Sequence, residues 1–186
     1  MPGRRMVATI VIYTVGHSTR PREELLELLH GAGVNAVADV RSYPSSRRHP
    51  QFNRAALEAW LPDDAVDYLH FPELGGRRQP VPDSHNAGWR ERGFRGYADY
   101  MATADFAAGI GRLERLAGTR TVAIMCAEGL WWRCHRRLIA DALVVRGWDV
   151  CHLGSGAPST HELTSFARVG EDRTVTYPPS QTSLEV

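Results

Sequence analysis

The amino-acid sequence predicts a single α/β domain with three layers, in which a mostly parallel sheet of about five strands lies between helices. Short runs of β-branched residues alternate along the chain with longer segments whose apolar residues recur at helical spacing, which is typical of βαβ units. Most of the short runs contain almost no polar residue, as expected for parallel strands that are covered on both faces. The length of 186 residues suits one domain, which we place at residues 7–170.

The strands are expected at residues 9–15, 35–40, 67–71, 121–125 and 149–153. Helices are expected between them and after the last strand, at residues 22–30, 53–61, 97–117, 134–146 and 160–166. Gly31 ends the first of these helices and Pro62 stops the second, whereas the third is expected to break near Asp105. Gly147 provides the C-terminal stop of the fourth helix, which has the strongest apolar stripe.

Two segments lack these patterns. Residues 72–96 contain many glycines, prolines and arginines, and are expected to form a long irregular loop of the kind that acts as a lid or a binding loop. Residues 171–186 contain two adjacent prolines and a polar end. They are expected to form a flexible C-terminal tail.

Composition and charge exclude several classes of function. The formal net charge is +1, from 22 basic and 21 acidic side chains, so the chain lacks a global field that would gather nucleic acid or anionic lipid. All the basic residues are arginines, which excludes Schiff-base and P-loop lysine chemistry. No apolar run approaches the length of a transmembrane helix, which is roughly 20 residues. The N-terminal sequence does not resemble a signal peptide. We expect a cytoplasmic protein without a membrane partner, whose three cysteines are reduced.

Polar and reactive residue types follow the expected strands at the point where each strand ends. Gly-His-Ser at residues 16–18 follows the first strand, Asp39 and Arg41 end the second, and Cys-Ala-Glu at residues 126–128 follows the fourth. Ligands of open parallel sheets bind in the crevice beyond the carboxyl ends of the strands. We therefore expect a site for a small anionic or nucleotide-like ligand at this edge of the sheet.

The most specific element runs from the strand at residues 121–125 through Cys126 to a helix that begins with several arginines. A thiol that faces a helix N-terminus and arginines should have a lowered pKa, because N–H groups and positive charge stabilise the thiolate. The same layout binds oxyanions. Cysteine phosphatases and rhodanese-type sulfurtransferases use a similar cradle with a shorter loop. We therefore expect Cys126 to be a nucleophile or a thiol carrier.

The remaining roles follow from side-chain chemistry at this edge. Glu128 and His17 are the expected proton-transfer groups, since a carboxylate and an imidazole can serve as general acid or base near neutral pH. The expected substrate-binding side chains, which include the arginine clamp for an anion, are Ser18, Asp39, Arg41, Arg77, Arg95, Tyr97, Trp132, Arg133, His135 and Arg136. No cofactor is expected.

Two other classes of protein stay open. The arginine-rich loops and the aromatic residues near them fit a non-catalytic module for a nucleotide or, less favoured, for nucleic acid, whose affinity would fall steeply with salt. A haem or metal protein with Cys or His ligands is the other class. Its ligands would be Cys134 and His135, with Cys126 as the third. Adjacent Cys134 and His135 would point about 100° apart on a helix, and the chain lacks the Cys-x2-Cys or His-x3-His spacing of structural zinc sites. We therefore predict no metal site.

Six motifs resemble a known family when they are taken in order. They are Tyr-Thr-Val-Gly-His-Ser at residues 13–18, Asp-Val-Arg-Ser-Tyr-Pro at 39–44, Pro-Gln-Phe-Asn at 50–53, Pro-Glu-Leu-Gly-Gly at 72–76, Phe-Arg-Gly-Tyr-Ala-Asp-Tyr at 94–100, and Cys-Ala-Glu with Trp-Arg-Cys-His-Arg at 126–136. Together they are similar to the domain of unknown function 488 family (DUF488), which is widespread in bacteria. The resemblance covers about residues 10–155. It implies an α/β fold, and the family has no assigned reaction.

The residues favour a cysteine-centred enzyme that acts on a small anionic or nucleotide-like substrate by sulfur transfer or hydrolysis. Sulfur transfer would need a persulfide on Cys126. Hydrolysis would need only a carboxylate and water, which would make Glu128 the essential residue.

Overall fold

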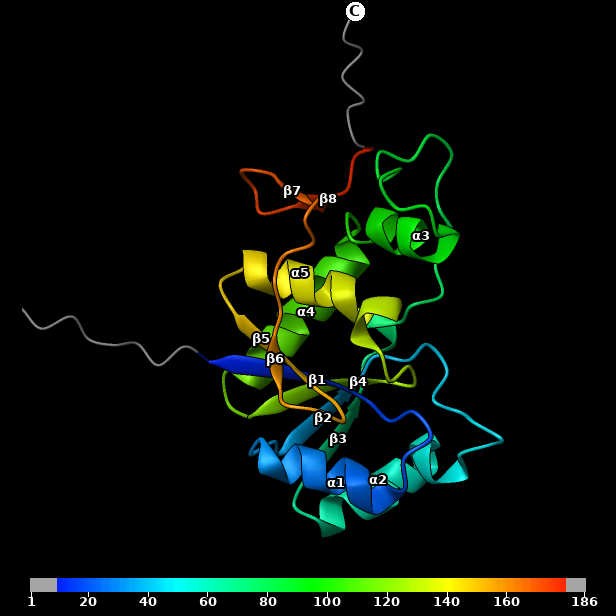
Figure 1. Ribbon diagram of the computed structural model, residues 1–186, viewed down its shortest axis with the longest axis vertical. Helices are drawn as coiled ribbons and strands as arrows, with labels where there is room; N and C mark the ends of the chain where they lie inside the picture. The colour runs from blue at the N-terminus through cyan, green and yellow to red at the C-terminus, as the bar shows by residue number, and fades with distance from the viewer. Residues whose placement is uncertain (1–9, 180–186) are drawn as a thin grey trace, which may run out of the picture.

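The computed structural model describes residues 10–179 and has the expected α/β architecture (Figure 1). Its main sheet has six strands in the order β3-β2-β4-β1-β5-β6, in which only the pairing of β5 with β6 is antiparallel. These strands are β1 (Val11–Gly16), β2 (Ala36–Asp39), β3 (Asp67–His70), β4 (Val122–Cys126), β5 (Asp149–Leu153) and β6 (Ser159–Thr160). A separate antiparallel ribbon consists of β7 (Arg168–Val169) and β8 (Val175–Thr176).

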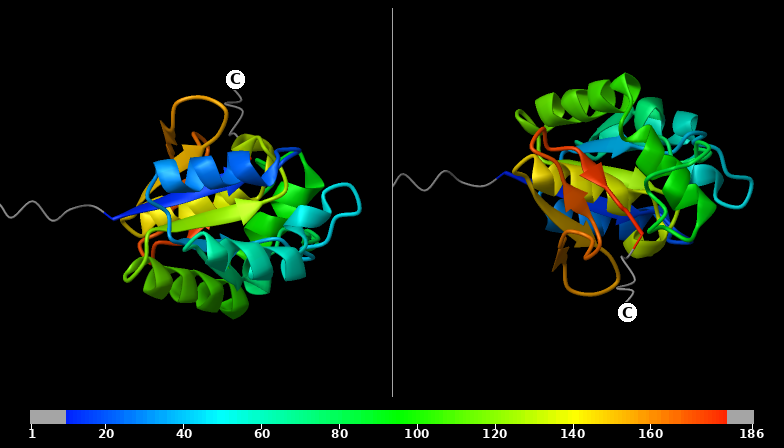
Figure 2. Two further views of the ribbon diagram at one scale, coloured as in Figure 1. Left: turned by 90° about the horizontal axis from the view of Figure 1, so that it is seen from below. Right: turned by 90° about the horizontal axis from the view of Figure 1, so that it is seen from above.

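Helices cover both faces of the main sheet. They are α1 (Arg22–Gly31), α2 (Arg54–Asp63), α3 (Arg92–Tyr100), α4 (Ala104–Ala117) and α5 (Arg136–Val145), with short 3-10 helices at Pro50–Phe52, Pro72–Leu74 and Trp131–Arg133. The α1 and α2 helices lie on one face, and α4 and α5 lie on the other (Figures 1 and 2). No helix among residues 10–179 is long and apolar enough to cross a membrane.

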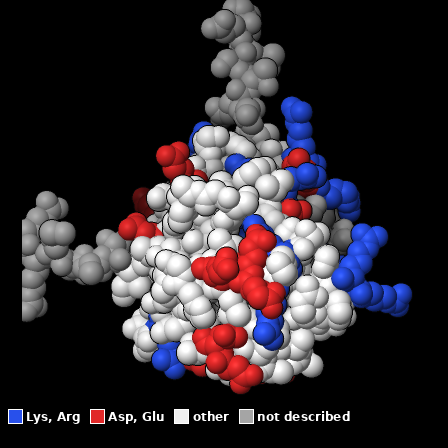
Figure 3. Space-filling view, turned by 60° about the horizontal axis from the view of Figure 1, so that its bottom comes forward, with Lys and Arg blue, Asp and Glu red and all other residues white. Residues whose placement is uncertain are grey.

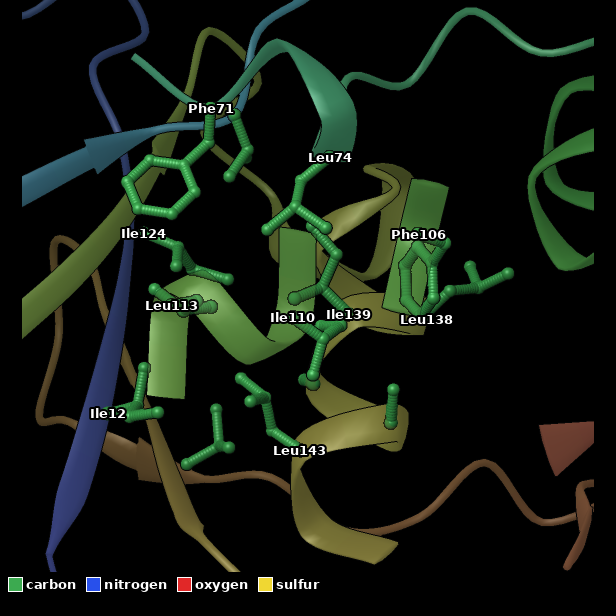
Figure 4. Close-up of a cluster of buried hydrophobic side chains, with 14 of the residues drawn as sticks. Ile12, Phe71, Leu74, Phe106, Ile110, Leu113, Ile124, Leu138, Ile139 and Leu143 are labelled. Carbon is green, nitrogen blue, oxygen red and sulfur yellow. The ribbon is translucent and has the colours of Figure 1, made fainter. Parts of the chain in front are cut away.

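The two faces of the sheet have separate apolar cores because side chains alternate along each strand. In β4, Ile124 faces the core that α4 and α5 complete, whereas Met125 faces the core of α1 and α2. Figure 4 shows the first of these cores, in which Ile110 and Leu113 of α4 pack beside Leu138, Ile139 and Leu143 of α5. A fully buried leucine or isoleucine contributes about 1.5–3 kcal/mol, so these two layers hold the strands in place.

The structure confirms the break in the third expected helix, which lies between α3 and α4. Four expectations about helices are wrong. The third helix begins at Arg92 and not at residue 97, so the first turn of α3 takes the place of the end of the expected loop at residues 72–96. Pro62 does not stop α2, which ends one residue later at Asp63, because a proline near the last turn breaks few backbone bonds. The fourth helix begins at Arg136 and not at residue 134. Residues 160–166 form no helix, because His161 donates its backbone N–H to Val150 and continues the sheet edge.

The C-terminal segment is packed where a flexible tail was expected. Val175 pairs with Val169 in the β7–β8 ribbon, and Tyr177 is completely buried. Tyr177 donates a hydrogen bond to Asp141 of α5 across 2.8 Å. Residues 171–179 therefore belong to the folded domain. The rest of the expected tail, residues 180–186, and the first residues of the expected domain and strand, 7–9, lie outside the described residues.

The topology creates a crevice at the carboxyl edge of the sheet. Strands β1 and β4 are neighbours, and Gly16 is the register partner of Cys126. The chain leaves β1 toward α1 on one face, whereas it leaves β4 toward α5 on the opposite face. Neighbouring parallel strands whose connections diverge in this way leave an open space between the two loops, which is where such folds bind ligands.

Candidate functional site

An open cavity of about 740 Å³ lies at this crevice, which is the size range of small-molecule sites. The loops that follow β1, β2 and β4 form much of its wall, and the loop after the Pro72–Leu74 helix and the start of α3 complete it. Of the expected site residues, the cavity brings together His17, Ser18, Arg41, Arg77, Cys126, Glu128, Arg133 and His135.

A cluster of two cysteines and one histidine forms one wall of the cavity. The donor atoms of Cys126, Cys134 and His135 all lie within 4.8 Å of one another, and Cys134 Sγ is 3.5 Å from Nδ1 of His135. Cys134 is buried, while the other two side chains are partly exposed to the cavity. The three cysteines of the chain are free thiols.

The expectation that Cys134 and His135 diverge was wrong because these residues precede the helix. Cys134 has an extended backbone, with φ −123° and ψ 149°, between the Trp131–Arg133 helix and α5. The 100° rotation between neighbours on a helix therefore does not apply to them. Both side chains lie close to Cys126, so the three residues can share one ion.

Hydrogen bonding fixes the orientation of the His135 ring. Its Nε2 lies 2.9 Å from the carbonyl oxygen of Val40, so Nε2 carries a proton and donates it. Nδ1 therefore presents its lone pair to the sulfur side of the cluster. Tyr97 packs against the back of the ring with a centroid distance of 5.1 Å and is itself fully buried.

The structure reverses the expected pKa shift of Cys126. The pKa of Cys126 lies well above its ordinary value because its thiol donates a hydrogen bond to Cys134 and is buried. The pKa of Cys134 lies well below its ordinary value because its sulfur accepts that hydrogen bond and because His135 and Arg136 lie close to it. Cys134, which sequence reasoning had considered only as a metal ligand, is therefore the more acidic thiol of the pair.

Arg41 is held rigidly at the floor of the cavity. Its guanidinium forms a buried ion pair with Asp39 at 2.5 Å, donates to the carbonyl of Phe52 at 2.9 Å, and donates through NH1 to Nε2 of His17 at 3.1 Å. Tyr68 donates a further hydrogen bond to Asp39 across 2.7 Å. A guanidinium has five N–H donors. Nε also donates to Asp39 at 2.9 Å, so these contacts leave one N–H of NH1 free for a ligand.

His17 supports Arg41 and is not free to accept a proton. Nδ1 donates to the carbonyl of Ser18 at 3.0 Å, and Nε2 is occupied by the arginine. The ring also stacks on Phe52 at 4.4 Å. Burial and the Arg41 charge lower the pKa of His17 to about 4. The side chain is therefore a weak base, and because both ring nitrogens are engaged it is poorly placed for the expected proton-transfer role.

The rim of the cavity is positively charged. Arg48, Arg77 and Arg133 are exposed and line it together with Arg41, whereas Glu128 is the one acidic side chain among the lining residues. In Figure 3, arginines gather along the right-hand edge, the side to which loops 42–50 and 77–91 project in Figure 1. The carboxylate of Glu128 accepts a hydrogen bond from the backbone N–H of Leu130 at 3.0 Å.

Several expected substrate-binding residues lie away from the cavity. Asp39 is fully buried beneath Arg41, and Tyr97 is buried behind His135. Arg95 donates to the carbonyl of Trp89 at 2.8 Å. Trp132 lines a second cavity, of about 400 Å³, on the other side of the loop that follows β4. These four side chains do not line the 740 Å³ cavity, and the first two position residues that do.

Arg136 is fully buried under the loop that follows β4 and is not part of an exposed clamp. It donates through NH2 to the carbonyl of Glu128 and through NH1 to Thr14 at 3.3 Å. Gly16 permits this packing, because a Cβ on Gly16 would overlap the same carbonyl of Glu128. Arg136 thus fixes the backbone that carries Cys126 and Glu128.

A chain of buried hydrogen bonds continues from Arg136 to a carboxylate. Thr14 bonds Nδ1 of His152 at 2.7 Å, Nε2 of His152 bonds Nδ1 of His161 at 3.0 Å, and Nε2 of His161 bonds Asp141 at 2.8 Å. Donors and acceptors alternate consistently along this chain when both histidines are neutral. It therefore links the buried positive charge of Arg136 to the buried negative charge of Asp141. Sequence reasoning missed it; the signal was a charged residue on the buried face of an apolar helix.

The comparison with family models matches residues 21–143, about two thirds of the chain, to the family described as "Domain of unknown function DUF488". The chain belongs to the DUF488 family. This match includes the Asp39–Arg41 ion pair and the whole Cys126–Cys134–His135 cluster, so the cavity walls derive mainly from the family domain. The first strand, with His17 and Ser18, precedes the matched residues. No curated protein and no solved structure matches the chain.

Proposed function

We propose that the protein is an enzyme that acts on a small anionic substrate in the 740 Å³ cavity, with the Cys126–Cys134–His135 cluster as its reactive centre. One observation carries the proposal: the cluster and four arginines line the same open cavity. The arginines would bind the anionic group, since guanidinium groups form paired, charge-assisted hydrogen bonds with phosphate, sulfate or carboxylate.

The arrangement separates binding from chemistry. Arg41 is fixed by Asp39 and His17, so its free N–H is pre-organised toward the cavity. Arg77 and Arg133 have exposed side chains at the rim, which can move to contact a ligand. A fixed donor with mobile partners favours an anion that enters from solvent and is then oriented against the cluster. Hydrolysis of a bound ester is the reaction we favour: water attacks the anionic group where it lies against the cluster, Glu128 accepts the proton of the water, and the alcohol leaves.

Sulfur transfer is the second candidate. Its support is the closeness of two thiols: one attacks the outer sulfur of thiosulfate and displaces sulfite, and the neighbouring thiol or cyanide then takes that sulfur from the persulfide. Two substrates separate the candidates. Release of nitrophenolate from p-nitrophenyl phosphate reports hydrolysis, and thiocyanate formed from thiosulfate and cyanide reports sulfur transfer.

Binding of inorganic pyrophosphate, measured by titration calorimetry, tests the anion site. Arg133→Ala is expected to weaken binding by roughly tenfold, since it removes one charge-assisted contact. Arg115→Ala removes an equally exposed arginine from α4, away from the cavity, and is expected to leave affinity unchanged. Equal effects of the two substitutions would contradict a specific anion site.

The non-catalytic alternative, a module for nucleic acid, has less support. Trp89 and Tyr97, two of the aromatic residues near the arginine-rich loops, are buried in the core and cannot stack bases. Salt dependence separates the alternatives: contacts to many phosphates would give a steep decline of log affinity with log salt for a single-stranded oligonucleotide. We expect weak oligonucleotide binding that pyrophosphate abolishes.

A further inference from the structure

We propose that Cys126, Cys134 and His135 bind a zinc ion, whose fourth coordination position is open to the cavity. The evidence for the metal site does not rest on the proposed anion site, although the two share a cavity. Two thiolates and an imidazole are the ligand types that zinc prefers, and hard cations such as Mg²⁺ or Ca²⁺ avoid them.

The separations of the donor atoms are close to those of a tetrahedral site. Zinc bonds of about 2.3 Å to sulfur and 2.1 Å to nitrogen place neighbouring ligands roughly 3.6–3.8 Å apart. Cys134 Sγ and His135 Nδ1, at 3.5 Å, already have this separation. All three donor atoms lie within 4.8 Å of one another. Small side-chain rotations of the cysteines would therefore complete the site.

His135 is prepared for metal binding by its second nitrogen. Metal-binding histidines usually donate their other ring N–H to a carbonyl or carboxylate, which fixes the tautomer and the ring orientation. Here Nε2 donates to the Val40 carbonyl at 2.9 Å, and Nδ1 is left with a lone pair directed at the cysteines. The carbonyl belongs to the residue after β2, so the sheet itself orients this ligand.

A glycine packs against the face of the His135 ring at Nδ1. A Cβ on Gly76 would lie 2.6 Å from Nδ1 of His135, which is closer than non-bonded atoms approach. Gly76 also lines the cavity. The absence of a side chain at this position therefore lets the loop pack against the face of the ring and helps to hold the ring in place.

The number of ligands indicates the kind of zinc site. Structural sites are usually closed by four protein ligands, whereas catalytic sites have three and leave one position for water or substrate. The described residues provide three, and all three line the open cavity. Two thiolates neutralise the charge of Zn²⁺, and the rim arginines would favour an anion at the fourth position. Zinc would supply Lewis-acid chemistry there.

Cobalt substitution tests the site without any assay of activity. The untagged full-length chain is stripped of metal under reducing conditions and titrated with Co²⁺. We expect one ion per chain, the strong visible bands of tetrahedral cobalt, and a thiolate charge-transfer band that Zn²⁺ removes by displacement. Absence of the charge-transfer band in the wild-type protein would overturn the proposal.

Cysteine variants identify the ligands. Cys126→Ser and Cys134→Ser are each expected to weaken Co²⁺ binding by roughly 10–100-fold or more and to diminish the charge-transfer band. Cys151→Ser is the matched control, because this third free thiol lies on β5 outside the cluster and should not affect binding. Loss of binding in the control, or unchanged binding in both cluster variants, would contradict the assignment.

X-ray absorption of the zinc-loaded wild-type protein gives a result that does not depend on whether variants fold. We expect two sulfur neighbours and one imidazole nitrogen in the first shell. A shell without sulfur would overturn the site, as would a Cys126–Cys134 disulfide in protein prepared with zinc under reducing conditions. Failure of pyrophosphate binding alone would remove the proposed anion site and leave the metal site standing.

Discussion

Arg41 donates a hydrogen bond from NH1 to Nε2 of His17 across 3.1 Å, so the histidine serves as an acceptor that holds the arginine in place. The histidine at the end of β1, which the sequence suggested as a proton-transfer group, is thus a hydrogen-bond partner of Arg41. The geometry makes His17 a positioning residue, and its ring is fixed further by Ser18 and Phe52.

His17→Gln and His17→Ala separate positioning from proton transfer. A glutamine oxygen can accept the Arg41 hydrogen bond, so we expect His17→Gln to retain most of the pyrophosphate affinity. His17→Ala removes the acceptor and should lower affinity by about tenfold. Calorimetric titration measures both. A large loss in His17→Gln as well would contradict a role as a simple acceptor.

Acid should destabilise the protein through His152. Burial, His161 and Arg136 lower the pKa of His152 to about 3 in the folded state. The unfolded chain, with an ordinary histidine pKa near 6.5, binds more protons between these values. The contribution of His152 to stability is therefore fully present above pH 6.5 and is lost as pH decreases toward 3.

Melting temperatures between pH 7.5 and 4.5 measure this decline. His152→Asn should flatten the curve, and an unchanged slope would show that protonation of His152 does not cause the decline.

Tyr177 should stabilise the domain although it lies in the expected tail. Its hydroxyl donates to Asp141 at 2.8 Å, and both groups are buried. Tyr177→Phe leaves the carboxylate with one partner fewer and should cost about 1–3 kcal/mol of unfolding free energy. Urea denaturation measures the difference. Thr176→Ala, at the neighbouring exposed position, serves as the control. A cost of Tyr177→Phe that does not exceed that of the control would mean that residues 171–179 contribute little to the fold.

Gly76→Ala should impair the metal site without removing a ligand. The added Cβ would lie 2.6 Å from Nδ1 of His135, so the ring or the loop must move. We expect Co²⁺ affinity to fall by roughly 10–100-fold, as for other changes in the surroundings of metal ligands. Gly31→Ala adds a methyl group that has no neighbour within 4 Å and should not alter binding. Equal affinities of the two variants would exclude a role for this close approach.

The sheet and most helices could be predicted because their signals are local. The β-branched run of β4 and the apolar stripe of α5 specify a strand and a helix without reference to the rest of the chain. The segment at residues 160–166 was mispredicted because its hydrogen bonds go to distant partners. His161 contacts Val150 and Asp141, which no local pattern reveals.

The sequence predicted where the candidate site lies, but only part of the chemistry of its residues. The rule for parallel sheets located Cys126, Arg41 and His17 at one edge, and the cavity contains all three. The roles depended on contacts that the sequence does not encode locally. Cys134 and His135 converge because α5 begins only at Arg136. The ion pair with Asp39 places Arg41 beside His17, which then serves as a hydrogen-bond acceptor for Arg41.

Alkylation of the native, metal-free protein with iodoacetamide, followed by site-resolved mass spectrometry with and without pyrophosphate, tests the central claim most directly. Cys126 and Cys151 are both partly exposed free thiols, but only Cys126 lines the arginine-rimmed cavity. We predict that pyrophosphate slows alkylation of Cys126 and leaves the rate at Cys151 unchanged. Equal rates at Cys126 in the presence and absence of saturating pyrophosphate would show that the anion does not bind beside the cysteine cluster, and would contradict the proposed site.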